Sequence, residues 1–388
     1  MKKLIYYAPA SYGGLLNYAQ EQANALAALG IDVTVVCSPN FVKRSSDLYV
    51  VLPKLVESRV AAGGNKILRA LRYVRVLLQN MATLRAEVAS GGFTHVLFAS
   101  YAEYFAPLWA GAYRHLAQRG VVFGAVVQEP VRNFQVGPKW WHRLSVGDAY
   151  SFLKYAFVHD DVALDTGRSM PDLNTLVVPY GLHQFPDATQ SREVTRRKLG
   201  IPENAVVLFA FGHIRDNKNL DYAVRALQEI PEAYLLVAGK RSASSQKPES
   251  FYQRLADSLG VAGRCKWVID YVSEEAAANY FTASDLVLLT YSSSFRSASG
   301  VLNVAAWYEK QSIVSAGQGS LQSVVLNYRI GVWVEPNEPG AVAAGIKEWM
   351  RKPLVPDWVA YKRENSWAEN ARLVVRAMSS PSSGVSMA

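Results

Sequence analysis

The sequence has 388 residues, half of them hydrophobic, and 41 Lys and Arg residues against 32 Asp and Glu residues give a formal charge of +9. A chain this long and this apolar is not disordered and favours two domains, and its charge favours an anionic partner. Its two cysteines are too few for a disulfide framework or a structural zinc site, so we expect a cytoplasmic protein.

The first half of the chain alternates short apolar runs with helical patterns. Predicted strands lie at residues 4–8, 32–37, 95–99 and 121–127. A helix is predicted over residues 15–29, directly after Gly13 and Gly14. This alternation is typical of a parallel sheet with helices on both faces, so we expect a Rossmann-like, doubly wound domain over residues 1–183.

A turn-rich and charged stretch over residues 184–198 is interpreted as a linker, and the same pattern restarts after it. Predicted strands lie at residues 206–211, 233–238, 266–269, 286–290 and 312–315. They predict a second doubly wound domain over residues 199–350. The Ser-rich residues 379–388 are expected to form a disordered tail.

Loops from a strand to the next helix are the expected binding sites, because ligands in open parallel sheets lie beyond the carboxyl ends of the strands. Gly13 and Gly14 form such a loop, where a phosphate or a sugar can approach the backbone. The alternative is a tight turn without a ligand. The loop lacks a Gly-x-Gly-x-x-Gly pattern, which argues against a nicotinamide-dependent oxidoreductase.

The loop after residues 206–211 contains Gly212, His213, Arg215 and Lys218. Arg215 would supply a planar fork and Lys218 a point charge for a diphosphate. The alternative is a solvated basic loop. His213 is a weaker candidate for the same cleft.

The loop over residues 291–299 is rich in hydroxyl groups and precedes a helix that is expected to begin at Gly300. Its amides and its serines, Ser297 and Ser299 among them, can bind a phosphate or a sugar. The alternative is an ordinary serine-capped helix.

Together these segments resemble a two-domain glycosyltransferase of the GT-B type, in the family 4 group that uses nucleotide sugars. The segments that carry the resemblance are Gly13-Gly14, Phe211-Gly212 with Arg215 and Lys218, residues 283–289, Ser299-Gly300-Val301-Leu302 with residues 313–315, and Asn365-Ser366-Trp367. The resemblance covers nearly the whole chain. It implies an α/β fold of two Rossmann-like domains facing a central cleft, with helices over residues 351–378 that cross back to the N-terminal domain.

The resemblance also implies how a nucleotide-sugar donor is held. The two glycines at 13 and 14 face its phosphate and sugar, Arg215 and Lys218 hold its diphosphate, and the backbone after residues 266–269 meets its base. The implied donor-binding residues are Gly13, Gly14, Gly212, His213, Arg215, Lys218, Ile269, Asp270, Ser297, Ser299, Gly300 and Val301. No metal ion and no cofactor is expected, since cationic groups and helix ends stabilise the departing nucleoside diphosphate.

The chain departs from the family pattern in two ways. Where the family has two glutamates eight positions apart, this chain has Ser297 and Ala305. Asn303 lies about 200° around the helix from Ala305 and cannot replace a carboxylate there. Where relatives often have His-Asp-Pro, the chain has Gln128-Glu129-Pro130. Glu129 is interpreted as orienting or deprotonating an acceptor hydroxyl, with Gln128 as a hydrogen-bonding neighbour; a helix-capping or salt-bridged Glu129 is the alternative.

Positive charge is concentrated in residues 51–90, which contain seven basic residues against two acidic ones. On a helix over residues 66–78, Ile67, Leu71, Val74 and Leu78 share one face and Arg69 and Arg72 lie opposite. Two interpretations stay open: an apolar face packed on the sheet with a solvated basic side, or a basic face on an anionic membrane surface. No run of 18 apolar residues predicts a membrane-spanning helix.

We therefore expect a metal-independent, retaining glycosyltransferase that moves a sugar from a nucleotide-diphosphate sugar to a carbohydrate or lipid-linked acceptor, in bacterial-type polysaccharide or glycolipid biosynthesis. The residues assigned to catalysis are Glu129, Arg215 and Lys218. The missing carboxylates leave an alternative, a GT-B protein that binds a nucleotide sugar or a partner enzyme without turnover. Nucleic acid is not an expected partner, because no aromatic and basic binding motif occurs. A cytoplasmic location fits both functions, with contact to the inner face of the membrane if the basic helix binds lipid.

Overall fold

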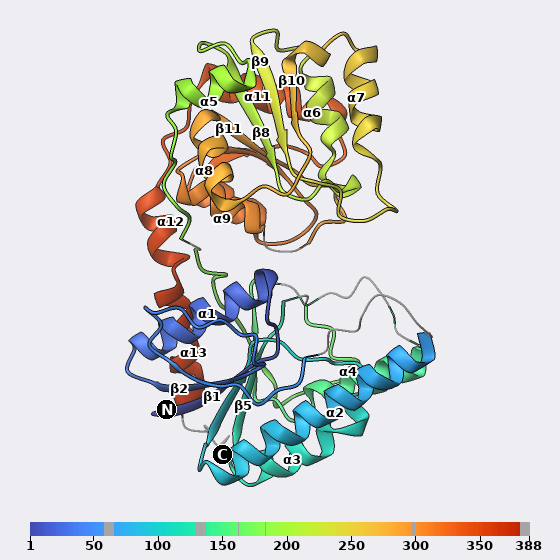
Figure 1. The fold of residues 1–388 in the computed structure, drawn as a ribbon, viewed down its shortest axis with the longest axis vertical. Coiled ribbons are helices and arrows are strands. Elements are labelled where there is room, and N and C mark those ends of the chain that lie inside the picture. The colour runs from blue at the N-terminus through green and yellow to red at the C-terminus, as the bar shows by residue number, and fades with distance from the viewer. Residues whose placement is uncertain are drawn as a thin grey trace, which may run out of the picture. The chain divides into compact units, whose positions relative to one another are not determined.

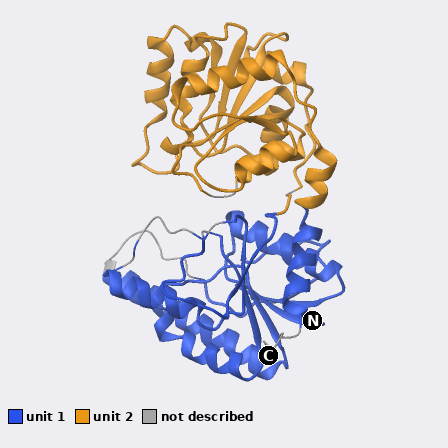
Figure 2. Cartoon of the chain, turned by 180° about the vertical axis from the view of Figure 1, so that it is seen from behind, with its two compact units in different colours: residues 1–180, 366–388 blue, residues 181–365 orange. Residues whose placement is uncertain are grey.

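The computed structural model describes residues 1–57, 66–128, 130, 135, 137–161, 163–182, 184–296 and 299–380. The chain forms two compact units, which we call unit 1 (Met1–Tyr180 with Ser366–Ala388) and unit 2 (Gly181–Asn365) (Figure 1, Figure 2). Each unit is a parallel sheet with helices on both of its faces.

Unit 1 contains a sheet of seven described strands in the order β3-β2-β1-β4-β5-β6-β7. Its strands are β1 (Lys3–Ala8), β2 (Asp32–Cys37), β3 (Val50–Leu52), β4 (His95–Phe98), β5 (Val122–Val126), β6 (Tyr155–Val158) and β7 (Asn174–Val177). Its helices are α1 (Gly13–Ala28), α2 (Lys66–Ser90), α3 (Ala110–Gln118), α4 (Lys139–Tyr150) and α13 (Trp367–Ser379), with a 3-10 turn η1 (Ala106–Leu108).

Alternate residues of each central strand of unit 1 enter two different cores. In β1, Leu4 and Tyr6 pack with α1 and α13, whereas Ile5 and Tyr7 pack with α2, α3 and α4. Both faces of the sheet are therefore buried, which explains why its central strands are nearly continuous apolar runs in the sequence.

A buried polar network fixes α13 to unit 1. Gln22 of α1 donates a hydrogen bond from Nε2 to Asn370 Oδ1 at 2.8 Å, and Asn370 Nδ2 donates to the Pro179 carbonyl at 2.6 Å. The Tyr6 hydroxyl donates to Gln22 Oε1 at 2.8 Å. Gln22 and Asn370 are both fully buried, so these bonds supply the partners that their amides would otherwise lack.

Unit 2 contains a sheet of six described strands in the order β10-β9-β8-β11-β12-β13. Its strands are β8 (Val206–Phe211), β9 (Ala233–Ala238), β10 (Cys265–Val268), β11 (Leu286–Thr290), β12 (Ser312–Ser315) and β13 (Gly331–Trp333). Its helices are α5 (Arg192–Leu199), α6 (Leu220–Ala226), α7 (Glu249–Ser258), α8 (Glu274–Ala283), α9 (Gly300–Trp307), α10 (Leu321–Asn327), α11 (Pro339–Arg351) and α12 (Trp358–Glu364), with 3-10 turns η2 (Asp216–Lys218) and η3 (Ala262–Arg264).

The stretch interpreted as a linker is partly helical. Helix α5 begins at a Ser191 cap, whose hydroxyl accepts a hydrogen bond from the Val194 amide at 3.3 Å. Arg196 on this helix is 1% exposed and pairs with Asp285 at 2.7 Å, while it also donates to the carbonyls of Ala283 and Ala205. Residues 192–198 are therefore part of unit 2 and not a free connection, because a buried guanidinium holds them there.

One of the two interpretations of the basic helix, an apolar face packed on the sheet, holds for only part of its length. The side of α2 that enters the core carries Val76, Leu77, Met81, Leu84 and Val88, and Leu78 packs against this core. Ile67 and Leu71, which that interpretation also packed on the sheet, are 68% and 61% exposed. The first turns of α2 therefore extend beyond the core.

The predicted tail also differs. Helix α13 continues to Ser379, and residues 381–388 of the expected tail lie outside the described residues. Among the described helices, none is long and apolar enough to cross a membrane.

Candidate functional site

The candidate site of unit 2 lies where the strand order changes direction. From β8 the chain continues to β9 on one side, while β11 pairs with β8 on the other side. The loops after β8 and β11 leave the carboxyl ends of these two neighbouring strands. A switch point of this kind is the usual ligand site in an open parallel sheet, because the loops that leave it diverge.

The loop after β8 begins with a close approach of two backbones. Gly212 has φ +85°, and its amide donates to the Ala238 carbonyl at 2.9 Å. Gly239 has φ +145°, and a Cβ atom on it would overlap the Gly212 carbonyl. Both positions need glycine, Gly212 for its left-handed backbone and Gly239 for contact with its neighbour as well.

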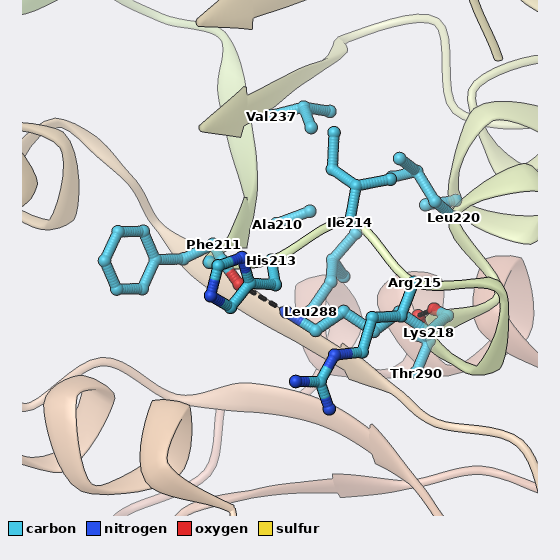
Figure 3. A pocket seen from close by; sticks show the side chains of 12 residues that line it. Ala210, Phe211, His213, Ile214, Arg215, Lys218, Leu220, Val237, Leu288 and Thr290 are labelled. Atoms are coloured by element: carbon cyan, nitrogen blue, oxygen red, sulfur yellow. Dashed lines mark hydrogen bonds between the residues drawn. The ribbon is translucent and has the colours of Figure 1, made fainter. Parts of the chain in front are cut away.

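Lys218 is the central cation of this site. Its Nζ donates a hydrogen bond to the Phe211 carbonyl at 2.7 Å, which Figure 3 marks with a dashed line. Burial, with a smaller contribution from the positive charge of Arg215, lowers the pKa of Lys218 to about 8. The ammonium group is thus held at the end of β8, where its positive charge is not fully solvated. An anion beside Lys218 would stabilise the charged form of this side chain.

Arg215 and His213 lie on the exposed side of the same loop. The Arg215 guanidinium makes no hydrogen bond or ion pair with a described residue, and in Figure 3 it extends away from the loop that carries it. The pocket under the loop encloses only about 20 Å³, which is too small for a phosphate group, and Arg215 and Gly212 line it. A guanidinium without a partner among the described residues suits an anionic ligand.

Hydrogen bonds join the loops after β8 and β11. The Thr290 hydroxyl donates to the Lys218 carbonyl at 2.8 Å, and the Ser292 amide donates to the Asn217 carbonyl at 2.8 Å. A Cβ atom on Gly212 would lie 3.5 Å from Lys218 Nζ and 3.8 Å from Val301 Cγ2. The structure therefore brings Gly212, Lys218 and Val301 together, as the sequence-based site required.

Ser299 and Gly300 stand at the start of α9. The Ser299 hydroxyl accepts from the Leu302 amide at 3.2 Å and pairs with the Tyr291 hydroxyl at 2.8 Å. This buried hydroxyl caps α9, which agrees with the alternative interpretation of an ordinary serine-capped helix. Gly300 is exposed. Ser297, the other serine assigned to the donor, lies outside the described residues.

Ile269 and Asp270 follow β10, two strands away from β8. Val268 pairs with Ala238, whose neighbour in β8 is Phe211. Two strand spacings amount to about 10 Å, which is about the distance from a diphosphate to the base of the same nucleotide. The position of Ile269 and Asp270 is thus compatible with the base contact that was expected of them.

Gly13 and Gly14 lie at the exposed start of α1 in unit 1. Gly13 has φ +73°, and no atom lies near the places where the Cβ atoms of the two glycines would be.

Ala305 stands at one of the two positions where the family has a glutamate. It is fully buried and offers no polar group, and the Asn303 side chain accepts a hydrogen bond from Tyr361 at 3.1 Å. Neither residue replaces the missing carboxylates.

The structure describes only one of the two residues that were predicted to lie on the acceptor side. Gln128 follows β5, and its buried Nε2 has no hydrogen-bond partner among the described residues. Glu129, assigned to acceptor activation, lies outside the described residues. The described part of the chain contains no group of three or more His, Cys, Asp or Glu side chains that could hold a metal ion.

Unit 1 has a large pocket that sequence reasoning did not identify. It encloses about 830 Å³ at the carboxyl ends of β1 and β4, which form the switch point of this sheet. It is lined by Tyr7, Pro9, Ala10, Ser11, Tyr12, Leu15, Val56, Glu57, Tyr73, Val76, Leu77, Asn80, Ser100, Tyr101 and Ala102. The position of Tyr12 directly before the glycine loop was the one signal in the sequence that could have indicated it.

Part of the chain is similar in sequence to known proteins, and nearly all of it is similar in structure. Residues 191–374 match the family described as glycosyl transferases group 1. The chain is 30% identical over 196 residues to D-inositol 3-phosphate glycosyltransferase from Streptomyces scabiei, which is 48% of this chain and 43% of that protein. It is 32% identical over 161 residues to the protein of the same name from Mycobacterium tuberculosis, 41% of this chain and 32% of that protein. The chain thus spans less than half the length of these relatives.

Solved structures match over nearly the whole chain. A glycosyltransferase from Rickettsia africae aligns with a TM-score of 0.68 at 15% identity, covering 97% of both chains. HepE from Anabaena, solved with UDP and glucose, aligns with a TM-score of 0.67 at 14% identity, covering 98% of this chain and all of that one. These likenesses and the two doubly wound sheets confirm the predicted GT-B fold.

Proposed function

We propose, on the premise that residues 191–374 form a glycosyl transferases group 1 domain, that this protein transfers a sugar from a nucleotide-diphosphate sugar to an acceptor hydroxyl. The domain includes the loops after β8 and β11 and the start of α9, so the proposal assigns donor binding to unit 2. The named relatives are glycosyltransferases, and HepE was solved with UDP and glucose, which supports a nucleotide sugar as the donor class.

The observation that carries the proposal is the pair of cations at the switch point of unit 2. Lys218 is half-buried at the end of β8, and Arg215 is exposed and unpaired among the described residues. Negative charge grows on the nucleoside diphosphate as it leaves the sugar, so cations fixed at this place lower the barrier. The reaction we propose needs no metal ion and no cofactor for this step, and it retains the configuration of the sugar.

The test is nucleotide binding with a matched control. Calorimetry against UDP, GDP and ADP should find one that binds, and the double variant Arg215→Ala/Lys218→Ala should weaken it by about 100-fold or more, since each lost charged contact is worth roughly tenfold. The control Arg351→Ala/Lys352→Ala removes the same two charges from the exposed end of α11 and should change nothing. Unchanged affinity in the first variant would refute the proposal.

A second candidate is binding without turnover, and Ala305 favours it. Where the resemblance places a carboxylate beside the donor, the structure has a fully buried methyl group. The two candidates differ in one measurement: a glycosyltransferase slowly hydrolyses its bound nucleotide sugar or transfers its sugar, whereas a binding protein returns it intact.

The acceptor we propose is a saccharide or a lipid-linked saccharide, as in bacterial-type polysaccharide or glycolipid synthesis, and the surface of unit 1 supports contact with an anionic membrane. Ile67, Leu68 and Leu71 on the first turns of α2 are 68%, 65% and 61% exposed. Arginines flank this stripe, and each one near an anionic surface contributes about 1 kcal/mol.

Aromatic contacts connect α2 to the start of α4. Tyr73 lies 6.4 Å from Phe105 between ring centroids, and Phe105 lies 6.3 Å from Trp141. Trp140, next to it, is 66% exposed, so an aromatic side chain suited to a membrane interface lies near the same end of unit 1.

Flotation with vesicles tests the membrane contact. The protein should float with vesicles that contain phosphatidylserine and not with neutral vesicles, and Ile67→Asn/Leu71→Asn should abolish flotation. The control Leu326→Asn alters a leucine of unit 2 that is 50% exposed and should float normally. Equal recovery on neutral and anionic vesicles would remove this part of the proposal.

A further inference from the structure

The end of strand β11 is bonded to the backbone of Lys218. The Thr290 hydroxyl donates a hydrogen bond to the Lys218 carbonyl at 2.8 Å, although the two residues stand 72 positions apart in the sequence (Figure 3). The Ser292 amide donates to the carbonyl of Asn217, the residue before Lys218, at 2.8 Å. Two consecutive carbonyls of the loop after β8 thus depend on the end of β11 for their hydrogen bonds.

Thr290 is the one donor to the Lys218 carbonyl within the part of the chain that the structure describes. Helix α6 does not reach this carbonyl, because Asn219 follows with a left-handed backbone at φ +47° and the Tyr222 amide bonds to the Asn219 carbonyl instead. A substitution that removes the Thr290 hydroxyl therefore removes the hydrogen bond of the Lys218 carbonyl, with no other described donor beside it.

Thr290 is itself held by the sheet. It is 4% exposed, and it pairs with Ser315 of β12. Directly after it, the Tyr291 amide donates to the Ser315 carbonyl at 3.0 Å, and the Ser315 hydroxyl donates to the Tyr291 carbonyl at 2.9 Å. The hydroxyl group that meets Lys218 therefore stands on a strand end whose position does not depend on the loop after β8.

Lys218 is fixed at its backbone and at the tip of its side chain. Its amide donates to the Arg215 carbonyl at 3.0 Å, and its Nζ donates to the Phe211 carbonyl at 2.7 Å. An ammonium group has three hydrogens, so two remain for an anion once one is used on Phe211. Because the lysine stem is flexible, the direction of these two hydrogens is defined only while both ends of the residue are held.

We propose that Thr290 is a positioning residue for Lys218, which through the Lys218 carbonyl keeps the ammonium group where the diphosphate of the donor binds. This inference rests on the proposed function, because it assigns to Thr290 an effect on nucleotide binding. Thr290 acts through Lys218 and not by touching the nucleotide. Its hydroxyl proton is used on the Lys218 carbonyl, and the pocket of about 20 Å³ that it lines is too small for a phosphate group.

A purely structural role of the same bond makes a different prediction. If the bond only stabilised unit 2, its loss would weaken nucleotide binding equally whether or not residue 218 is a lysine. If Thr290 acts through Lys218, its loss matters only while the ammonium group is present. A double-mutant cycle measures this difference, because two residues that act as a unit have effects that do not add.

The cycle uses calorimetry on the full chain at pH 7, with the one of UDP, GDP and ADP that the wild type binds best. Thr290→Val should weaken binding by about threefold to tenfold. In the Lys218→Met background, the same substitution should change the affinity by less than about twofold. Valine keeps the shape of threonine and suits a strand, so β11 is expected to form in this variant.

Three further variants identify the hydroxyl as the cause. Thr290→Ser keeps the hydroxyl and should bind within about twofold of the wild type. Thr290→Ala removes the hydroxyl without placing a methyl group against the carbonyl, and it should weaken binding as Thr290→Val does. Thr195→Val is the matched control, since Thr195 of α5 is 3% exposed and its hydroxyl has no hydrogen-bond partner among the described residues. It should leave the affinity unchanged.

The outcomes separate this inference from the proposed function. A wild type that binds none of the three nucleotides, or a Lys218→Met variant that binds as tightly as the wild type, would refute the proposed function and this inference with it. If Lys218→Met does weaken binding, the inference alone would be overturned by a loss from Thr290→Val that is equal in both backgrounds or absent from both. A Thr290→Ser variant as weak as Thr290→Val would overturn it as well.

Discussion

Raising the pH through 8 removes the proton from Lys218 in the free protein, and this makes nucleotide binding a proton-coupled reaction. The pKa of Lys218 is lowered to about 8, chiefly by burial. A diphosphate beside Nζ favours the charged form and moves the pKa back toward its ordinary value of 10.5. Binding at a pH between these two values must therefore take up a proton.

The size of the effect follows from the two pKa values. At pH 8.5 about one quarter of the free protein is protonated at Lys218, so binding takes up about three quarters of a proton. For the same reason, affinity should be about tenfold weaker at pH 9 than at pH 7. At pH 7 the uptake should be near zero, because Lys218 is already charged.

Calorimetry in buffers of different ionisation enthalpy measures this uptake directly. The nucleoside diphosphate that binds best would be titrated into the protein at pH 8.5 and at pH 7. Lys218→Arg keeps its proton at both pH values and Lys218→Met has none, so both variants should show no buffer dependence. A wild-type binding enthalpy that is the same in all buffers at pH 8.5 would refute the role assigned to Lys218.

Two further substitutions, each with a matched control, test the local structure of unit 2 by chemical unfolding. Gly239→Ala should lower the free energy of unfolding by about 1–3 kcal/mol, because its Cβ overlaps the Gly212 carbonyl, and Gly263→Ala, which meets no atom within 4 Å, should change it by less than about 0.5 kcal/mol. Arg196→Met should cost about 3–5 kcal/mol, since it removes the buried one of the two arginines paired with Asp285 and the hydrogen bonds to the buried carbonyls of Ala283 and Ala205. Arg192→Met removes a pair whose arginine is 37% exposed and should cost less than about 1 kcal/mol; equal losses in the two arginine variants would contradict the burial argument.

The central strands were predictable because they are buried on both faces. β8, β9, β11 and β12 occupy the predicted residues, since each contains consecutive apolar residues between turn signals. The edge strand β7 was not identified. Its residues are mostly exposed, so the chain there lacks the apolar run on which the prediction depends.

The sequence could predict only those parts of the site that depend on residues close together along the chain. Lys218 and Arg215 follow a buried strand within one loop, so their shared location could be inferred from the sequence. The need for glycine at 239 depends on the register between β8 and β9, and the position of Val56 depends on its hydrogen bonds to Asn80. Such long-range contacts leave no periodic signal in the sequence.

The exposure of Ile67 and Leu71 has a similar origin. They lie on the same side of the helix as Leu78, which packs against the core, but they stand in the first turns of α2, beyond the end of that core. A periodic pattern shows that an apolar side exists, and only the tertiary structure decides how much of its length is buried.

Unit 1 consists of two segments that are separated in the sequence by all of unit 2, and this sets an order for biosynthesis. Trp367, Ala371 and Val374 of α13 complete the core on the α1 face of the first sheet, yet the ribosome reaches them only after residues 181–365 have been made. Until then, the nascent first sheet exposes an apolar face and Gln22 lacks its hydrogen bond to Asn370, while unit 2 already has its full sequence. We expect unit 2 to fold first, and chaperones that bind exposed apolar segments to associate with the earlier half of the chain during translation.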